Sequence, residues 1–223
     1  MELPCAWTIT QGDPSIVIAM VDNFFYPDHP DLAGRFTNVS SCRFPPSSSP
    51  SHGTACAGAA AGIVDNGLCV AGGSFSSRVD AYCWNDGILN AMWRAYRLGR
   101  PIISLSAWNT SWGYDSPMTR AAFKEIVDGG TVITYSVWGS NAMNFADIDG
   151  LIVVGMAYAD GWFRTYRSGF PDLNIDMVVP SRDISRLNQG SCAIGEGNKC
   201  PHDTYLCHHR HILLTTSELR PIN

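Results

Sequence analysis

The stretch Ser15-Ile-Val-Ile-Ala-Met-Val21, followed directly by Asp22, decides the fold class of this 223-residue chain. After the first serine every residue is apolar, without the alternation of a strand that has one wet face. Such a run is typical of a strand that is covered on both faces, as in parallel sheets. Similar runs predict further strands at Val79–Tyr82, Ile102–Leu105, Thr131–Ser136, Leu151–Gly155 and Ile175–Val179.

Helix-like segments lie between the predicted strands, at Ala55–Ile63, Ile88–Leu98 and Met118–Val127. The last of them begins after Ser116-Pro117, a cap residue followed by a proline at the first helical position. Alternation of strands and helices implies crossover connections, and hence parallel strands with helices on both faces. The predicted fold is therefore α/β, a three-layer α/β/α arrangement around a mostly parallel, doubly wound sheet.

The composition indicates one globular domain, which we expect to span residues 1–223. Hydrophobic residues make up 45% of the chain and charged residues 16%, so a sizeable core can form. The net charge is −5 and Lys and Arg are not clustered, which argues against nucleic acid as a partner. The longest apolar run, Leu151–Ala159, is shorter than the roughly 20 residues of a membrane-spanning helix.

Two polar residues, Asp22 and His52, stand where such a fold places its chemistry. Doubly wound sheets bind ligands beyond the C-terminal ends of their strands, and Asp22 follows the first predicted strand. His52 opens the small-residue segment His52-Gly-Thr-Ala-Cys-Ala-Gly58 at the entrance to a helix. Taken singly, the aspartate is typical of a turn or a helix cap, and the histidine of a loop. Taken together, the two segments carry a resemblance to a known family, which changes this interpretation.

Four segments together resemble the subtilisin-like serine proteases, and the kexin/furin branch in particular. Val17–Leu32 is similar to that family's Asp segment, and His52–Gly58 to its His segment. Asn66–Gly72 is similar to the loop that follows, including its cysteine, here Cys69. Thr131–Asn141 is similar to the strand that leads to the oxyanion Asn. The resemblance implies that Asp22 orients the imidazole and that His52 accepts the proton of a nucleophile.

The same resemblance implies roles for Asn141 and for Ser104-Leu-Ser106. The side chain of Asn141 is the expected hydrogen-bond donor to the oxyanion, and the alternative for Gly139-Ser-Asn141 is an ordinary turn. The residues Ser104, Leu105 and Ser106 are expected to pair with an extended polypeptide substrate.

Two serines compete for the role of nucleophile. The segment Thr215-Thr-Ser217-Glu-Leu-Arg-Pro221 keeps the family's Thr-Ser and its proline, but not the glycine before them. The segment Gly190-Ser-Cys-Ala193 keeps a glycine and lacks the proline. We expect Ser217, with Ser191 and then Cys192 as alternatives; a helix cap is the non-catalytic interpretation of Ser217.

Departures from the family's pattern leave a second function open. The family continues beyond its serine, whereas this sequence ends at Asn223, so we expect a C-terminally truncated domain that also lacks its pro-segment. It is expected to be either a fragment or truncated gene model, or a domain that a partner chain completes, such as a pro-segment or the missing C-terminal part. Bulky Phe24, and Thr215 in place of glycine, make an inactive, peptide-binding pseudoprotease the alternative. Since Asn23 stands where the basic-pair-cleaving branch has an acid, we do not expect strict cleavage at basic pairs, although Asp86 could match a retained acid.

Calcium is the expected ion. Asp31 and Asn66 match positions that hold a stabilising calcium in the family. Backbone oxygens are expected to complete an all-oxygen set, from Ile63, Leu68 and Val70. In the alternative interpretation Asp31 caps a turn and Asn66-Gly67 is a plain turn.

Eight cysteines are many for a reducing cytosol and favour disulfides and a secreted or secretory-pathway location, with the leader absent from this chain. Asn38-Val-Ser40 and Asn109-Thr-Ser111 are glycosylation acceptor tripeptides. The resemblance implies the disulfides Cys69–Cys207 and Cys192–Cys200. The alternative is a zinc or redox module on Cys200, Cys207, His202, His208, His209 and His211.

Overall fold

A computed structural model describes residues 3–23, 25–40, 52–68, 70–84, 87–106, 116–136, 145, 147–157 and 176–180. The strands within these residues are β1 (Val17–Asp22), β2 (Phe36–Asn38), β3 (Arg78–Cys83), β4 (Ile102–Leu105), β5 (Val132–Ser136), β6 (Leu151–Ala157) and β7 (Met177–Pro180). The helices are α1 (Leu3–Trp7), α2 (His52–Ala61), α3 (Ile88–Arg97), α4 (Pro117–Asp128) and the short 3₁₀ helix η1 (Pro30–Leu32). None of the described helices is long and apolar enough to cross a bilayer.

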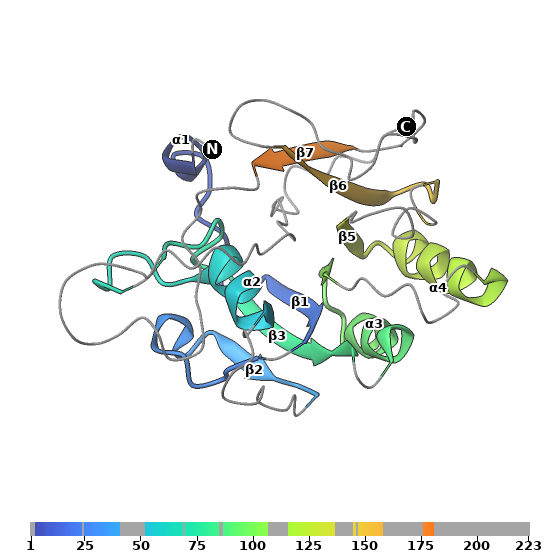
Figure 1. The fold of residues 1–223 in the computed structure, drawn as a ribbon, viewed down its shortest axis with the longest axis horizontal. Helices are drawn as coiled ribbons and strands as arrows, with labels where there is room; N and C mark the ends of the chain where they lie inside the picture. The colour runs from blue at the N-terminus through green and yellow to red at the C-terminus, as the bar shows by residue number, and fades with distance from the viewer. Residues whose placement is uncertain are drawn as a thin grey trace.

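The described strands form one seven-stranded sheet in the order β2-β3-β1-β4-β5-β6-β7 (Figure 1). Every pair of neighbours in it is parallel. The chain builds outward from β1 in both directions, with β3 on one side and β4 on the other, so the order reverses beside β1. The prediction of a doubly wound parallel sheet is confirmed. Folds of this class usually bind ligands where the strand order reverses, which here is the C-terminal end of β1.

Helices cover both faces of the sheet, and the side chains of β1 show how the two cores are divided. Ile18 and Met20 join the core beneath α2, whereas Ala19 and Val21 join the core beneath α3 and α4. Successive side chains of a strand point to opposite faces, so α2 lies across the sheet from the other two helices. All four residues are at most 1% exposed. This burial explains why the run of apolar residues in β1 does not alternate.

The predicted strands and helices are confirmed with shifted ends, and β2 is an addition. This edge strand has three residues, too few for a recognisable apolar pattern. It contacts the core through Phe36, whose ring centre lies 5.6 Å from that of Phe25. In α4 the predicted start is confirmed, because the Ser116 side chain accepts a hydrogen bond from the backbone N–H of Thr119.

Helix α2 begins at His52, three residues before the predicted start at Ala55. Contacts with the chain after β1 fix its first turn. The backbone N–H of Gly53 donates to the carbonyl oxygen of Asn23 at 2.8 Å. The hydroxyl of Thr54 accepts from the backbone N–H of Tyr26 at 2.7 Å. These tertiary hydrogen bonds are invisible to local sequence patterns, and they bring the histidine to the end of β1.

Candidate active site

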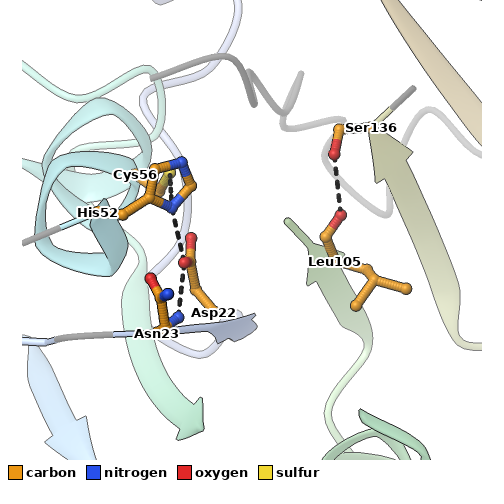
Figure 2. A network of polar contacts seen from close by, with 6 residues as sticks. All are labelled: Asp22, Asn23, His52, Cys56, Leu105 and Ser136. Atoms are coloured by element: carbon orange, nitrogen blue, oxygen red, sulfur yellow. Dashed lines mark hydrogen bonds and ion pairs between the residues drawn. The ribbon is translucent and has the colours of Figure 1, made fainter. Parts of the chain in front are cut away.

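Asp22 and His52 are in direct contact at the C-terminal end of β1. The Nδ1 atom of His52 lies 2.7 Å from the Oδ1 atom of Asp22, as Figure 2 shows. The aspartate side chain is 2% exposed and the histidine side chain 27% exposed. The second ring nitrogen of His52 points away from the carboxylate (Figure 2). One side of the imidazole therefore contacts a buried carboxylate, and part of the ring is exposed.

The hydrogen bonds of the Asp22 carboxylate are uneven. Its Oδ1 atom accepts from His52 and also from the backbone N–H of Asn23, at 2.6 Å. Its Oδ2 atom is buried and has no hydrogen-bond partner among the described residues. Because the carboxylate accepts from Nδ1, the proton of neutral His52 resides on that nitrogen and the lone pair on Nε2. This tautomer is the one required of a general base.

A glycine at position 53 makes this contact possible. A Cβ atom there would lie 2.7 Å from the Asn23 carbonyl oxygen and 2.7 Å from the Phe25 ring. Since the backbone cannot retreat cheaply, any side chain at Gly53 would push the first turn of α2 away from β1. His52 belongs to that turn.

Replacing Gly53 by alanine is expected to lower turnover on the order of 10²-fold, because displacement of a catalytic group by about 1 Å costs that much. The change is measured as kcat for the peptide hydrolysis that the sequence resemblance implies. Ala59→Ser, at a half-buried position of the same helix, is the matched control and should stay near wild type. Full activity of a folded Gly53→Ala variant would contradict this view of the helix start.

Cys56 contributes a thiol to the same place. Its sulfur lies 3.8 Å from Nδ1 of His52, and its side chain is buried. The two residues are four positions apart on α2 and so share one helix face, a signal that the sequence contains. Ligand atoms of Asp22, His52 and Cys56 lie within 4.8 Å of one another, which is close enough for a metal ion. Since the Asp22–His52 hydrogen bond already uses two of these atoms, we assign the cluster to acid–base chemistry.

The peptide-pairing role expected of Ser104 and Leu105 does not fit the sheet. Strand β4 lies between β1 and β5, and both residues pair with neighbours on either side. The Leu105 carbonyl oxygen also accepts from the Ser136 hydroxyl at 3.4 Å (Figure 2). A central strand has no free edge for a substrate. Ser106 follows the strand, and its N–H donates to the Val21 carbonyl oxygen at 3.1 Å.

Asp31 and Asn66, the expected calcium ligands, come together away from the imidazole. The amide nitrogen of Asn66 donates to Oδ1 of Asp31 at 2.7 Å, and the backbone N–H of Val70 donates to Oδ2 at 3.1 Å. Asp31 is 0% exposed and forms no ion pair with the described Lys, Arg or His residues. A buried carboxylate without a basic partner is costly, and a bound cation relieves that cost.

The surroundings of Asp31 fit calcium in donor type. The Asp31 carboxylate and the Asn66 amide carry oxygen atoms, the donor type that hard cations prefer. Each carboxylate oxygen accepts one hydrogen bond and so keeps a lone pair. The Asn66 oxygen itself accepts from the backbone N–H of Leu68 at 2.9 Å.

The other expected site residues lie outside the described residues: Asn141, Ser191, Cys192, Ser217, Cys69, Cys200, Cys207, His202, His208, His209, His211, Phe24, Thr215, Asp86 and Asn109.

One disulfide was not predicted from the sequence. Cys83, at the end of β3, is disulfide-bonded. Its register partner in β1 is Asp22, so a covalent link lies one strand away from the Asp22 carboxylate.

Comparison with known proteins gives the family of the chain. The family model described as the Subtilase family matches residues 13–154. Proprotein convertase subtilisin/kexin type 4 of Homo sapiens is 29% identical over 157 residues, covering 60% of this chain and 21% of that protein. Furin of Homo sapiens is 27% identical over 124 residues, covering 51% of this chain and 16% of furin. The matched regions are thus a minor part of each relative.

Solved structures agree on the fold. The prenylagaramide maturation protease PagA has a TM-score of 0.67 at 21% identity, covering 84% of this chain and 73% of that one. Fervidolysin from Fervidobacterium pennivorans has a TM-score of 0.62 at 23% identity, covering 86% and 32% respectively. With the sheet order, the Asp22–His52 contact and the family match in agreement, this chain belongs to the subtilase family of serine peptidases and is similar to its kexin/furin branch.

Proposed function

We propose that the protein is a serine endopeptidase that hydrolyses polypeptides by acyl transfer. The observation that carries this proposal is the 2.7 Å contact between His52 Nδ1 and Asp22 Oδ1 at the C-terminal end of β1. A buried carboxylate bound to a partly exposed imidazole is an arrangement that activates a hydroxyl nucleophile. The family to which the chain belongs uses such a pair.

In the proposed reaction Ser217 is the nucleophile. Its hydroxyl oxygen attacks the peptide carbonyl carbon while Nε2 of His52 takes the hydroxyl proton. The Asp22 carboxylate stabilises the imidazolium that forms. The Asn141 amide donates to the oxyanion, a contact that in serine proteases is typically worth roughly 3–4 kcal/mol in the transition state. His52 then protonates the leaving amine, and water releases the acyl group from Ser217 by the same steps in reverse order.

We propose that the substrate binds as an extended strand. Because the edges of β4 are occupied, the pairing segment of the protein begins no earlier than Ser106. Asn23 is neutral and leaves no acidic side chain directly after Asp22. We therefore expect cleavage that is not restricted to pairs of basic residues. The similarity to proprotein convertases and the disulfide of Cys83 support a secretory-pathway location.

Peptide cleavage tests the proposal. The protein is incubated with a mixture of unrelated peptides, and the products are identified by mass spectrometry. We expect cleavage that stops when His52 is replaced by glutamine. A folded protein that binds peptides but leaves them intact would instead support the pseudoprotease.

We also propose a structural calcium ion near Asp31 and Asn66, with backbone carbonyls of Ile63, Leu68 and Val70 completing the set. Such an ion would neutralise the buried carboxylate and tie the loop after α2 to η1. It has no part in the chemistry at His52.

Calcium is expected to raise the melting temperature by roughly 5–10 °C at a concentration one hundred times its Kd, since such binding stabilises the folded state by about 2.7 kcal/mol. The measurement is thermal unfolding with calcium and with chelator. The rise should vanish in Asp31→Asn and persist in Asp128→Asn, an exposed carboxylate on α4 paired with Lys124. An equal calcium response in the two variants would refute the site.

A further inference from the structure

Asn23 lies between the Asp22 carboxylate and Trp84, the residue that directly follows strand β3. Its amide has one orientation that satisfies both neighbours. In that orientation the amide nitrogen lies 3.3 Å from Oδ1 of Asp22, and the amide oxygen lies 3.3 Å from the indole Nε1 of Trp84. The reverse orientation would set the amide oxygen against the carboxylate and the amide N–H against the indole N–H. Figure 2 shows Asn23 directly beside Asp22.

The sheet register explains why these residues meet. Asp22 is the last residue of β1 and lies opposite Cys83, the last residue of β3. The residues that directly follow these two strands are therefore Asn23 and Trp84. Trp84 is half-buried and packs against the core that lies under α3 and α4. The indole is thus anchored in the body of the protein, and its N–H has a fixed place from which to orient the Asn23 amide.

The Asp22 carboxylate depends on this support. Oδ1 receives the His52 proton, the Asn23 backbone N–H and, in this orientation, the Asn23 side-chain amide. Oδ2 is buried without a partner among the described residues. All the hydrogen bonds described for the carboxylate therefore act on one oxygen, the oxygen that holds the imidazole. Each such bond helps to fix the direction of the carboxylate.

We propose that Asn23 and Trp84 are positioning residues for the Asp22–His52 pair. The hydrogen bonds run from the indole N–H to the Asn23 oxygen, from the Asn23 amide to the carboxylate, and from the imidazole N–H to the same carboxylate oxygen. A neutral residue at position 23 supports the carboxylate without adding a second negative charge beside the imidazole. The effect on turnover rests on the proposed function, whereas the effect on the imidazole does not.

The imidazole itself is the first readout. Among the described residues the titratable groups around His52 are the Asp22 carboxylate and the Cys56 thiol, and Cys83 is disulfide-bonded and does not titrate. In Asn23→Asp a second carboxylate adjoins this pair, so the pKa of His52 should rise, because the added negative charge favours the imidazolium. NMR titration measures the pKa, with the resonance assigned by its loss in His52→Ala. Asp147→Asn, on an exposed surface, is the control and should leave the pKa unchanged.

Coupling between the two residues is the second readout. Trp84→Phe keeps the ring and removes the indole N–H, so kcat should fall by roughly 3–10-fold with KM unchanged. Asn23→Ala should lower kcat by a similar factor, and the double variant should lose no more than Asn23→Ala alone. Trp93→Phe, on α3 beside Tyr96, is the control and should match wild type.

Three results would overturn the inference. They are an unchanged pKa of His52 in Asn23→Asp, losses of kcat that multiply in the double variant, and a rise in KM that accounts for the whole loss of kcat/KM. If the wild-type protein cleaves no peptide, the proposed function fails by itself. The NMR titration still tests in that case whether residue 23 adjoins the Asp22–His52 pair, because it needs no turnover. Folding of each variant is checked by its melting temperature.

Discussion

Replacing His52 by alanine is expected to lower kcat for peptide hydrolysis by about 10⁶-fold, the largest effect of any single change outside the nucleophile. Without the imidazole nothing removes the proton from the serine hydroxyl or returns it to the leaving amine. Binding and oxyanion stabilisation survive, so a residual rate about 10³–10⁴-fold above uncatalysed hydrolysis should remain. The quantity to measure is single-turnover or steady-state cleavage of a peptide that the wild-type protein hydrolyses.

His29 provides the matched control for this change. It is buried at 1% exposure, and its Nδ1 accepts the backbone N–H of Asp31 at 3.2 Å, so it is a structural histidine. His29→Asn keeps an acceptor at that position. We expect a lower melting temperature and turnover within severalfold of wild type. A loss of turnover in His29→Asn equal to that in His52→Ala would contradict the assignment of the general base to His52.

Replacing Asp22 by asparagine is expected to lower kcat by about 10⁴-fold with little change in melting temperature. The asparagine amide fills the same space but offers an N–H where the carboxylate accepted one. Nδ1 of His52 would then accept, its proton would move to Nε2, and the general base would lose its lone pair. Without the negative charge the imidazolium is also less stable. Both effects act on turnover and leave substrate binding largely intact.

The test of Asp22→Asn separates chemistry from folding. Kinetic constants and thermal unfolding are measured on the same preparation. Asp147→Asn removes an exposed carboxylate that pairs with Arg120 at 2.9 Å, and it should change neither quantity appreciably. If Asp22→Asn retained turnover within tenfold of wild type, the 2.7 Å contact would have no catalytic meaning.

The fold was predictable because β1 and the other central strands are buried on both faces and therefore apolar throughout. The pairing of Asp22 with His52 was predictable for a related reason, since a strand end and a helix start meet at the same edge of a parallel sheet. β2 was missed because three residues leave no pattern. The early start of α2 depends on hydrogen bonds from Gly53 and Thr54 to the segment after β1, which local signals do not contain.

Other features of the site could not be predicted without knowing how the strands of the sheet are paired. The sequence of Ser104 and Leu105 is compatible with an edge strand and with a central strand. Only the pairing of β4 with β1 and β5 shows that both of its edges are occupied, which leaves no edge for a peptide substrate. The contact of Asn23 with Trp84 arises because β1 and β3 end in register, although the two residues lie far apart in sequence. Cys56 is the exception, because its helical spacing from His52 was readable in advance.

Labelling with a fluorophosphonate tests the central claim most directly, since this reagent forms a covalent bond only with an activated serine. The modified residue is identified by peptide mass spectrometry in the wild type, in His52→Ala, in Ser217→Ala and in Ser191→Ala. We predict a label on Ser217 that persists in Ser191→Ala and is lost in the other two variants. No label on the folded wild-type protein, or a label that does not depend on His52, would contradict the account.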